Sequence, residues 1–460
     1  MHLILLSGGS GQRLWPLSNI SRSKQFLKVL TSKREPEVRI SMIQHIWQQL
    51  CETSLSNCSV ISTSKSQVDI IQNQIGCNPP LIIEPDRRDT YPAIMLSSLY
   101  LHSIKKISPN EVIVVIPVDF YVEEEFFEHI KSLEGILKKS NADLVLVGIN
   151  PIFPSQRYGY IVPDYSKNQN QYQAVTSFTE KPNDKQAKQL INEGAFWNAG
   201  IFTFKLGYVL DHLQRRGHTI DYEEMVKSYA TLPQNSFDYE LVEKVKNIVV
   251  APYKGKWKDL GSWSSLTEEI DATLIGNGNI SSDCHNINVI NELEVPVSVI
   301  GASNLIVAVS SDGILVADKD ASEQIKEISK QFKQRPMYEE KRWGWYRVLD
   351  SFRLKDGDEV LTKRIFVEAG ANLSYQKHFH RYEVWTVVSG TGLVVVNKTI
   401  RKIKVGDVVQ IPKNTLHSVK ALTDLELIEV QTGLTLIEED ILRIFLTWDE
   451  IQDYCRAIGK

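Results

Sequence analysis

The first half of the chain alternates between short apolar runs and longer amphipathic segments. The apolar runs are rich in Val, Ile and Leu, as buried parallel strands are, and they cover residues 2–7, 57–63, 80–85, 111–119 and 142–149. Helical patterns lie between them, for example over residues 90–107 and 123–140. This alternation predicts an α/β fold of the doubly wound, Rossmann-like kind.

The pattern changes twice in the second half. From about residue 275, short β-like segments are separated by Asn, Gly and Ser, which predicts a short β-solenoid or a small sheet. A charged helical segment then ends near Pro336 and is interpreted as a linker. After Trp343 the many short strands with Gly-rich turns predict an all-β barrel or jelly roll. The predicted units are residues 1–270, 271–330 and 331–460.

Length and composition narrow the class of protein. A chain of 460 residues exceeds the roughly 250–300 residues that one core supports, so two or three domains are expected. The net charge of −4 gives no sign of a nucleic-acid or membrane partner. We expect no signal peptide, because no basic segment precedes the short first apolar run, and no membrane span, because no apolar stretch approaches the ~20 residues that cross a bilayer. The five cysteines are scattered, as in reduced cytosolic proteins, and we expect a cytoplasmic protein.

A glycine-rich loop follows the first apolar run. Gly8, Gly9 and Gly11 match neither the dinucleotide fingerprint nor the P-loop. Glycines nevertheless let an anion approach the backbone, whose N–H groups can form an anion-binding nest. Arg13 and Lys24 add positive charge within the next turns. We therefore predict a phosphate-binding loop, with a plain strand-to-turn connection as the alternative.

Two aspartates are candidate metal ligands. Asp119 directly follows an apolar run, and ligands of an open α/β sheet bind beyond the carboxyl ends of its strands. Asp259 lies beside Gly261 and two tryptophans. Mg²⁺ typically takes one or two carboxylates together with phosphate oxygens, so a converging pair would suit a nucleoside triphosphate. A helix cap is the alternative role for Asp119.

A set of motifs, each weak alone, occurs in a specific order: GGSGQRLWPLS…KQFL, EPDRRDTYPAI, PVD, RYGYI, FTEKP, WNAGIFTF, SFDYELVE and KWKDLGSW. In this order they resemble the mannose-1-phosphate guanylyltransferases, a group of sugar-phosphate nucleotidyltransferases, over roughly residues 1–330. The resemblance implies that GTP and mannose-1-phosphate are converted into GDP-mannose and pyrophosphate with Mg²⁺ as cofactor. A homodimer is the candidate assembly.

The resemblance also implies roles for individual residues. The nucleotide-binding set comprises Ser7, Gly8, Gly9, Gly11, Arg13, Lys24, Glu84, Arg88, Asp89 and Thr90. Within this set, Glu84 lies where the family reads guanine. The sugar-phosphate set comprises Tyr158, Gly159, Glu180, Lys181, Asn198 and Gly200. The catalytic set comprises Arg13, Lys24 and the two metal-binding aspartates, Asp119 and Asp259.

The chain departs from the family pattern at two of these motifs. Asp89 stands where the family usually has Asn, and Phe120 stands where it has His. A carboxylate accepts hydrogen bonds but cannot donate them, so the change at Asp89 bears on the preference for GTP. The alternatives are the same transfer with another nucleotide or hexose-1-phosphate, and a non-catalytic sugar-nucleotide sensor. The retained cations and aspartates argue against a sensor.

The C-terminal β region resembles the cupins, in particular the mannose-6-phosphate isomerase half of two-activity guanylyltransferases. Residues 370–390 and 406–417 resemble the two cupin motifs. The resemblance implies one metal site made of Gln376, His378, Glu383 and His417. His380 is an alternative ligand. Imidazole and carboxylate ligands suit Zn, Fe, Ni or Mn, and the alternative is a barrel that has lost its metal.

The isomerase pattern is incomplete in this chain. Val384 stands where the type usually has His, and the segment IFLTWDEI replaces an Asp-x-Tyr-Gly-Arg ending. The absent histidine and arginine would be natural acid–base and phosphate-binding groups. We therefore expect a bound divalent metal with weak or no isomerase activity, and a bifunctional enzyme is the alternative.

Overall fold

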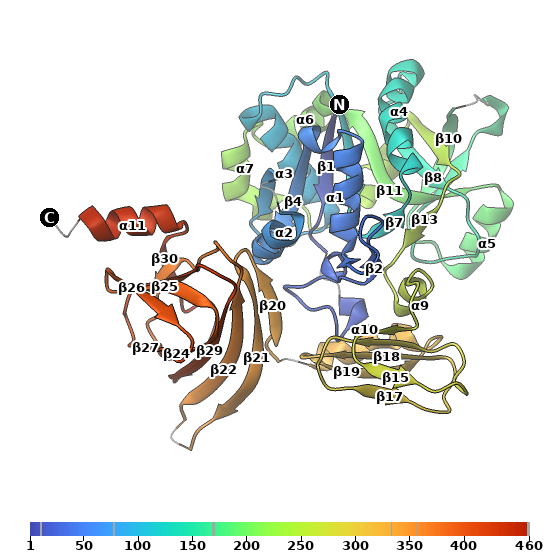
Figure 1. Cartoon of the computed structure of the whole chain (residues 1–460). Coiled ribbons are helices and arrows are strands. Elements are labelled where there is room, and N and C mark those ends of the chain that lie inside the picture. Colours follow the sequence, from blue (N-terminus) through green and yellow to red (C-terminus); the bar gives the residue numbers. More distant parts are fainter. Residues whose placement is uncertain (10–11, 77–78, 168–170, 333, 356, 458–460) are drawn as a thin grey trace.

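The computed structural model describes residues 1–9, 12–76, 79–167, 171–332, 334–355 and 357–457. Its N-terminal part is built on a mixed β-sheet (Figure 1). The strands of this sheet are β1 (His2–Leu6), β4 (Ser59–Ser64), β5 (Leu81–Glu84), β6 (Val112–Pro117), β8 (Leu144–Ile149), β9 (Tyr160–Pro163), β10 (Gln173–Thr179), β11 (Phe196–Lys205) and β12 (Ile248–Tyr253). Their order is β5-β4-β1-β6-β11-β8-β12-β10-β9.

Strand direction agrees in part with the alternating sequence pattern. Strands β5, β4, β1 and β6 are parallel, and so are β8 and β12. Strand β11 runs antiparallel between β6 and β8, and β9 and β10 are antiparallel at the edge. The predicted α/β architecture is confirmed. The antiparallel strands are additions that the alternation of apolar runs did not predict.

Helices cover both faces of this sheet because its side chains alternate between two apolar cores. Leu3 and Leu5 of β1 lie in one core, and Ile4 lies in the other. Four helices contribute to the first core: α1 (Met42–Glu52), α2 (Val68–Ile75), α4 (Glu125–Ser140) and α5 (Asp184–Asn192). Four others contribute to the second core: α3 (Thr90–Leu99), α6 (Leu206–Arg215), α7 (Tyr222–Ser228) and α8 (Phe237–Glu240).

Short strands connect the two larger parts of the molecule. They are β14 (Leu274–Ile275), β15 (Gly278–Ile280), β16 (Asn288–Asn291), β17 (Val297–Val299), β18 (Leu305–Ser310) and β19 (Gly313–Asp318). Strands β14, β16 and β18 are parallel neighbours, as are β15 and β17, whereas β18 and β19 form an antiparallel pair. The helices on either side of this region are α9 (Trp263–Thr267) and α10 (Ile325–Ile328).

The C-terminal part consists of two antiparallel sheets and a terminal helix, α11 (Trp448–Ala457). One sheet has the order β20-β21-β22-β29-β24-β27, with bounds Tyr338–Lys341, Gly344–Arg353, Glu359–Val367, Leu425–Gly433, Arg381–Ser389 and Val408–Ile411. The other has the order β26-β25-β28-β23-β30, with bounds Thr399–Lys404, Thr391–Val396, His417–Ala421, Tyr375–Lys377 and Leu442–Phe445. Apolar side chains from both sheets form one core. The predicted β-rich C-terminal domain is confirmed.

A buried glutamate joins the C-terminal part to the N-terminal part. Strand β20 lies against α2 (Figure 1), and Glu340 of β20 is 5% exposed. Its Oε2 accepts a hydrogen bond from Gln74 Nε2 at 3.1 Å and is 3.0 Å from Lys28 Nζ. Gln74 Nε2 also donates to the carbonyl of Phe26 at 2.9 Å. The C-terminal domain therefore holds the segment that follows the glycine loop.

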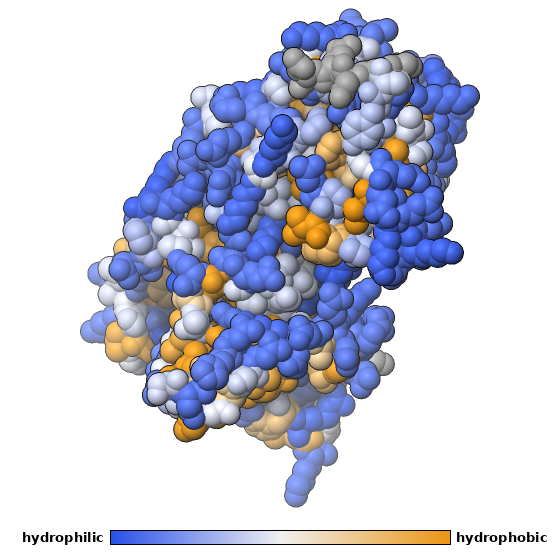
Figure 2. Space-filling model, turned by 90° about the vertical axis from the view of Figure 1, so that its right-hand side faces the viewer, coloured by the Kyte–Doolittle hydropathy of each residue, from blue (hydrophilic) through white to orange (hydrophobic). Residues whose placement is uncertain are grey.

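Over the described residues, every helix is too short or too polar to span a bilayer. The face shown in Figure 2 is mostly hydrophilic, with separate smaller orange areas. Four cysteines in the described ranges, Cys51, Cys58, Cys284 and Cys455, carry free thiols.

Candidate active site

Two pockets open beyond the carboxyl ends of the parallel strands. The first has a volume of 210 Å³, and its lining comes from the glycine loop, the ends of β1, β5 and β6, and the start of α3: Leu6, Gly8, Gly9, Gln25, Glu84, Arg87, Arg88, Asp89, Thr90, Ala93, Pro117 and Asp119. These strand ends meet because β1 pairs in parallel with β4 and β6, and β4 pairs in parallel with β5. Most of the predicted nucleotide-binding residues thus line one pocket. Gly11 lies outside the described residues.

Glu84 is held deep in this first pocket. It is 6% exposed, accepts a hydrogen bond from Tyr229 Oη at 2.9 Å and accepts one from Ser62 Oγ at 3.4 Å. A Cβ atom on Gly8 would lie 3.1 Å from Glu84 Oε1, so glycine gives the loop room beside this carboxylate. Burial raises the pKa of Glu84 to about 7, although both hydrogen bonds favour the ionised form. Glu84 therefore titrates near neutral pH.

Asp89, which departs from the family pattern, has an unusual backbone conformation. Asp89 has a φ of 72°, and its carboxylate accepts a hydrogen bond from the N–H of Thr90 at 2.7 Å, where α3 begins. With a ψ of −175°, this conformation lies outside the left-handed α region that Asn and Asp tolerate and in a region populated mostly by Gly. The hydroxyl of Thr90 accepts from the N–H of Phe237 at 2.9 Å, and Arg88 donates to the carbonyl of Leu232. This part of the pocket is fixed by local hydrogen bonds.

Asp119 and Asp259 converge on the ammonium group of Lys24. Nζ of Lys24 lies 2.9 Å from Asp119 Oδ2 and 3.0 Å from Asp259 Oδ1. The convergence results from an antiparallel pair of strands, β7 (Phe120–Val122) and β13 (Trp257–Asp259). Because β7 begins directly after Asp119 and β13 ends at Asp259, their pairing places the two carboxylates together.

Neighbouring charges of the protein stabilise the ionised forms of Lys24 and Asp259. Burial disfavours the charged form of Lys24, but the two carboxylates outweigh it and raise its pKa. Burial likewise works against ionised Asp259, yet Lys24, Arg13 and Arg157 hold the pKa of Asp259 below its usual value. Asp259 is therefore an ionised acceptor, as a ligand of a divalent cation must be.

The second pocket has a volume of 250 Å³ and shares Pro117 and Asp119 with the first. Its remaining lining includes both predicted and unpredicted residues: Arg13, Lys24, Phe120, Arg157, Tyr158, Gly159, Glu180, Asn198, Ala199, Gly200, Asp238, Trp257 and Asp259. Lys181 is not in this lining. Its ammonium group lies 2.7 Å from Glu180 Oε1 and over the ring of Tyr239.

Asp238 is the acidic residue of this pocket that the sequence analysis missed. It accepts a hydrogen bond from Asn198 Nδ2 at 2.8 Å. Burial, followed by the nearby charge of Glu180, raises the pKa of Asp238 to about 7. Burial also raises the pKa of Glu180. The sequence could have indicated Asp238, because this residue lies within SFDYELVE, one of the motifs that carry the family resemblance.

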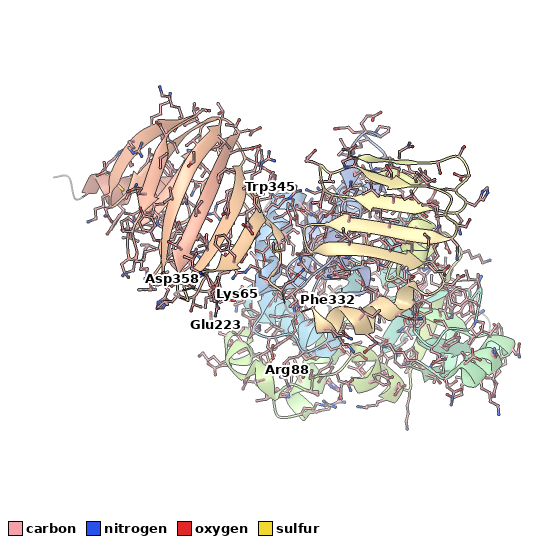
Figure 3. The ribbon with its side chains drawn as sticks, turned by 90° about the horizontal axis from the view of Figure 1, so that it is seen from below. Lys65, Arg88, Glu223, Phe332, Trp345 and Asp358 are labelled. Atoms are coloured by element: carbon pink, nitrogen blue, oxygen red, sulfur yellow. The ribbon has the colours of Figure 1, made fainter. Side chains whose placement is uncertain are left out.

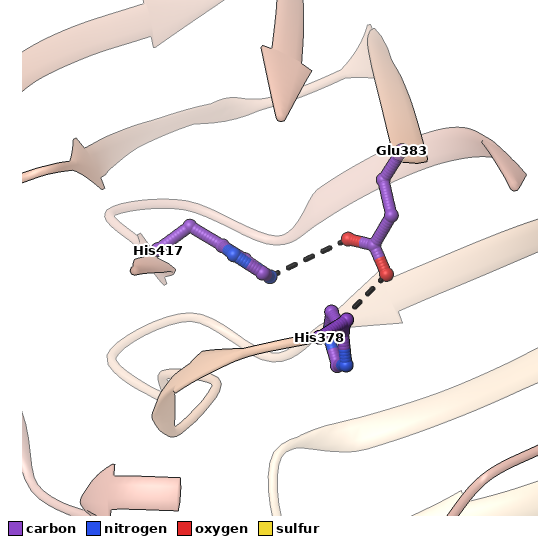
Figure 4. Close-up of side chains that lie close together, drawn as sticks. All are labelled: His378, Glu383 and His417. Carbon is purple, nitrogen blue, oxygen red and sulfur yellow. Dashed lines mark ion pairs between the residues drawn. The ribbon is translucent and has the colours of Figure 1, made fainter. Parts of the chain in front are cut away.

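A separate cluster lies inside the C-terminal domain. His378, Glu383 and His417 are buried, and their ligand atoms lie within 4.8 Å of one another (Figure 4). Nε2 of His378 is 3.3 Å from Glu383 Oε1, and Nε2 of His417 is 3.4 Å from Glu383 Oε2. Gln376 Nε2 is 3.3 Å from His378 Nε2. His380 is exposed, and its backbone N–H donates to Asp440, so the structure places it apart from the cluster.

The hydrogen bonds of the cluster suit a cation. Nδ1 of His417 lies 2.8 Å from the carbonyl of Thr415, and Nδ1 of His378 contacts the carbonyl of Asp440. A carbonyl only accepts, so each Nδ1 donates, and in the neutral form of each ring the lone pair of Nε2 points inwards. Nε2 of His417 and Oε2 of Glu383 have no hydrogen-bond partner in the described residues. Two acceptors thus face each other, which a metal ion would relieve.

An arginine shares the cluster. Arg381 Nε donates to Glu383 Oε1 at 2.9 Å, and Arg381 Nη2 lies 3.1 Å from His378 Nε2. A second buried cation, Lys363, lies 2.6 Å from Glu438 Oε1. The arginine of the usual isomerase ending is absent, yet these two cations lie inside the domain. Strand alternation places both of these cations there.

Comparisons with known proteins agree with this architecture. Residues 2–274 match the family model for nucleotidyl transferase, and residues 329–445 match the model for the mannose-6-phosphate isomerase C-terminal domain. A solved structure from Thermus thermophilus, described as a mannose-1-phosphate geranyltransferase, superposes with a TM-score of 0.60 at 24% identity, over 72% of this chain and 99% of that one. The class of protein is therefore a nucleotidyl transferase joined to an isomerase-type domain.

Relatives that align over nearly the whole chain identify the family within this class of protein. Mannose-1-phosphate guanylyltransferase RfbM of Salmonella typhimurium is 31% identical, over 96% of each chain. Xanthan biosynthesis protein XanB of Xanthomonas campestris is 30% identical, over 96% of this chain and 97% of its own. The chain belongs to the mannose-1-phosphate guanylyltransferase family.

The C-terminal cluster generates a test by metal analysis. We expect His417→Ala and Glu383→Gln to lower the divalent metal content of the purified protein at least about tenfold, because each removes a ligand atom from the cluster. The control is His285→Ala, which alters an exposed histidine of the middle segment. Mass spectrometry of the metal after dialysis measures the content. Metal retained equally in all three variants would contradict the assignment.

Proposed function

We propose that the chain makes GDP-mannose and pyrophosphate from GTP and mannose-1-phosphate. The observation that carries the proposal is the junction of the two pockets, where Lys24, Asp119 and Asp259 converge. The first pocket would receive GTP, and the second would receive the sugar phosphate. The shared lining residue Asp119 then lies where the two substrates meet.

The reaction proposed at this junction is an in-line displacement. A phosphate oxygen of mannose-1-phosphate forms a bond to the α-phosphorus of GTP. The bond from that phosphorus to the bridging oxygen breaks, and pyrophosphate leaves with the electron pair. Positioning of the substrates and neutralisation of phosphate charge are the main contributions of the protein. Lys24 and Arg13 are the proposed neutralising side chains of the chain itself.

Individual roles follow the pocket linings. The backbone N–H groups of Gly8 and Gly9, which line the first pocket, are proposed to hold phosphate oxygens. The N–H of Ser7 already donates to the carbonyl of Ser62 at 2.9 Å, so Ser7 is left out of this role. The proposed sugar contacts come from residues around the second pocket: Tyr158, Gly159, Glu180, Asn198 and Gly200. Asp119 and Asp259 would hold Mg²⁺, whose donor preference they match. When bound, Mg²⁺ supplies positive charge to the phosphates.

The domain limits 1–270, 271–330 and 331–460 are likewise proposals. The parallel pairing of β14, β16 and β18 supports a short β-solenoid, and the two packed antiparallel sheets support a cupin jelly roll. The free thiols of the described cysteines support a cytoplasmic location.

Replacing either metal-binding aspartate tests the junction. Asp119→Asn and Asp259→Asn should each lower turnover by about a hundredfold or more, because an amide of the same shape lacks the anionic charge. Binding of GTP without metal should persist. The control Asp184→Asn alters an exposed carboxylate of α5. Pyrophosphate release measures turnover, and rates like those of the unmodified enzyme in both site variants would remove the metal assignment.

Glu84 generates a test by pH. If ionised Glu84 accepts hydrogen bonds from guanine, kcat/KM for GTP should rise between about pH 6 and 8, because kcat/KM reports the free enzyme and the pKa of Glu84 is about 7. In Glu84→Gln this rise should flatten, and preference for GTP over ATP should fall at least about tenfold. Any ionisation of GTP itself affects the unmodified enzyme and the Glu84→Gln variant equally, so the comparison isolates Glu84. An unchanged profile and preference would place base recognition elsewhere.

The C-terminal domain supports a second candidate activity, the isomerisation of mannose-6-phosphate. The buried His378–Glu383–His417 cluster and the match of residues 329–445 favour it. Val384 in place of a histidine argues against efficient proton transfer. We expect little or no fructose-6-phosphate in a coupled assay with metal-loaded protein. Brisk formation of fructose-6-phosphate would mean that other groups, with Arg381 and Lys363 as candidates, fill these roles.

A further inference from the structure

A third pocket adjoins the second pocket, the one proposed to receive the sugar phosphate, on the side of the linker. It has a volume of 210 Å³, and its polar lining consists of three cations, one carboxylate and two serines: Arg13, Arg157, Lys326, Glu323, Ser262 and Ser322. Arg13 and Arg157 also line the second pocket, so the two cavities are neighbours. Lys326 and Glu323 come from the linker that leads to the C-terminal domain.

The segments that form the walls of this third pocket pack against one apolar core. Leu14, Trp263 and Ile325 are buried in a common cluster. This cluster holds the turn that carries Arg13, helix α9 and helix α10 in fixed positions. Further along the linker, the ring of Phe332 packs on Trp15 with 4.7 Å between ring centroids, and Figure 3 shows Phe332 beside the linker helix. The linker is therefore anchored beside the glycine loop.

Positive charge is in excess in this pocket. Arg157 forms an ion pair with Glu323. No ion pair of Arg13 or Lys326 with any other described residue is present. The serine hydroxyls are engaged locally, since Ser262 caps α9 and Ser322 donates to the carbonyl of Lys319. Three cations against one carboxylate leave a site suited to a ligand with at least two negative charges.

We infer that this third pocket binds a diphosphate, the β- and γ-phosphates of GTP that leave as pyrophosphate, and that Arg157 and Lys326 are binding residues for it. The inference rests on the proposed function. The base and the sugar have pockets of their own, whereas the leaving group, which gains the electron pair of the broken bond, needs cations where its charge develops. Arg157 and Lys326 lie next to Arg13, a proposed phosphate-binding residue.

Glu323 acts as a competitor for the same arginine. Its side chain is 61% exposed, so it can move into solvent when an anion arrives. With the pocket free of anion, Glu323 pairs with Arg157. Release of pyrophosphate then restores this ion pair, which lowers the affinity for the product and favours its departure.

Titration calorimetry with magnesium pyrophosphate and the full-length protein tests the inference without requiring turnover. Lys326→Ala and Arg157→Gln should each weaken binding about three- to tenfold, since each removes one charged contact. Glu323→Gln should strengthen binding by a similar factor. The matched control is Lys330→Ala, which alters an exposed lysine of the same linker that pairs with Glu327 and should leave binding unchanged.

Kinetics of the reverse reaction provide the second readout. In Lys326→Ala the KM for pyrophosphate should rise by the same factor as the dissociation constant, with the KM for GDP-mannose unchanged. Equal pyrophosphate binding in Lys326→Ala and Lys330→Ala would overturn the inference. So would a change confined to mannose-1-phosphate, which would assign the pocket to a phosphate monoester. An absence of turnover would refute the proposed function alone, because the calorimetric result is independent of it.

Discussion

The ion pairs of Lys24 with Asp119 and Asp259 are the contacts on which the candidate site depends. Two carboxylates placed close together repel each other unless a cation lies between them. The ammonium group of Lys24 pairs with both and offsets this repulsion. It thereby keeps the junction of the two pockets assembled without a bound ligand. A divalent cation arriving with the nucleotide meets two carboxylates that already lie together.

Local periodicity was sufficient to predict much of the fold. The apolar runs at 2–7 and 111–119 became neighbouring parallel strands, because a run that is apolar on both faces must be covered on both faces. Strand β11 was harder to predict, since its sequence shows burial but does not reveal its direction. Direction is set by which connections the chain can make, and no single segment contains that information.

Individual residues of the site could be predicted from the sequence, but their arrangement in space could not. The positions of Asp119 and Asp259 in motifs pointed to a metal, yet their approach depends on the pairing of β7 with β13, two strands of three residues each. Asp238 was missed because an acidic residue in a helical motif is usually exposed. In the C-terminal domain, Arg381 and Lys363 occupy inward positions of alternating strands. Charged residues in strands are normally taken to face water, so the burial of Lys363 was not predicted.

The buried contact of Glu340 with Gln74 and Lys28 has a consequence for how the two halves can be inherited or engineered. Arg22, which forms a bidentate ion pair with Glu292 and lies 3.8 Å from Glu340, is 6% exposed. A gene truncated after the linker would remove Glu340 and so take an acceptor from Gln74 Nε2 and from Lys28 Nζ. Arg22 would keep its ion pair with Glu292 but would become newly open to water. The transferase half therefore cannot be treated as a detachable module. Recombination at the linker would have to supply a carboxylate of equivalent placement from the incoming domain.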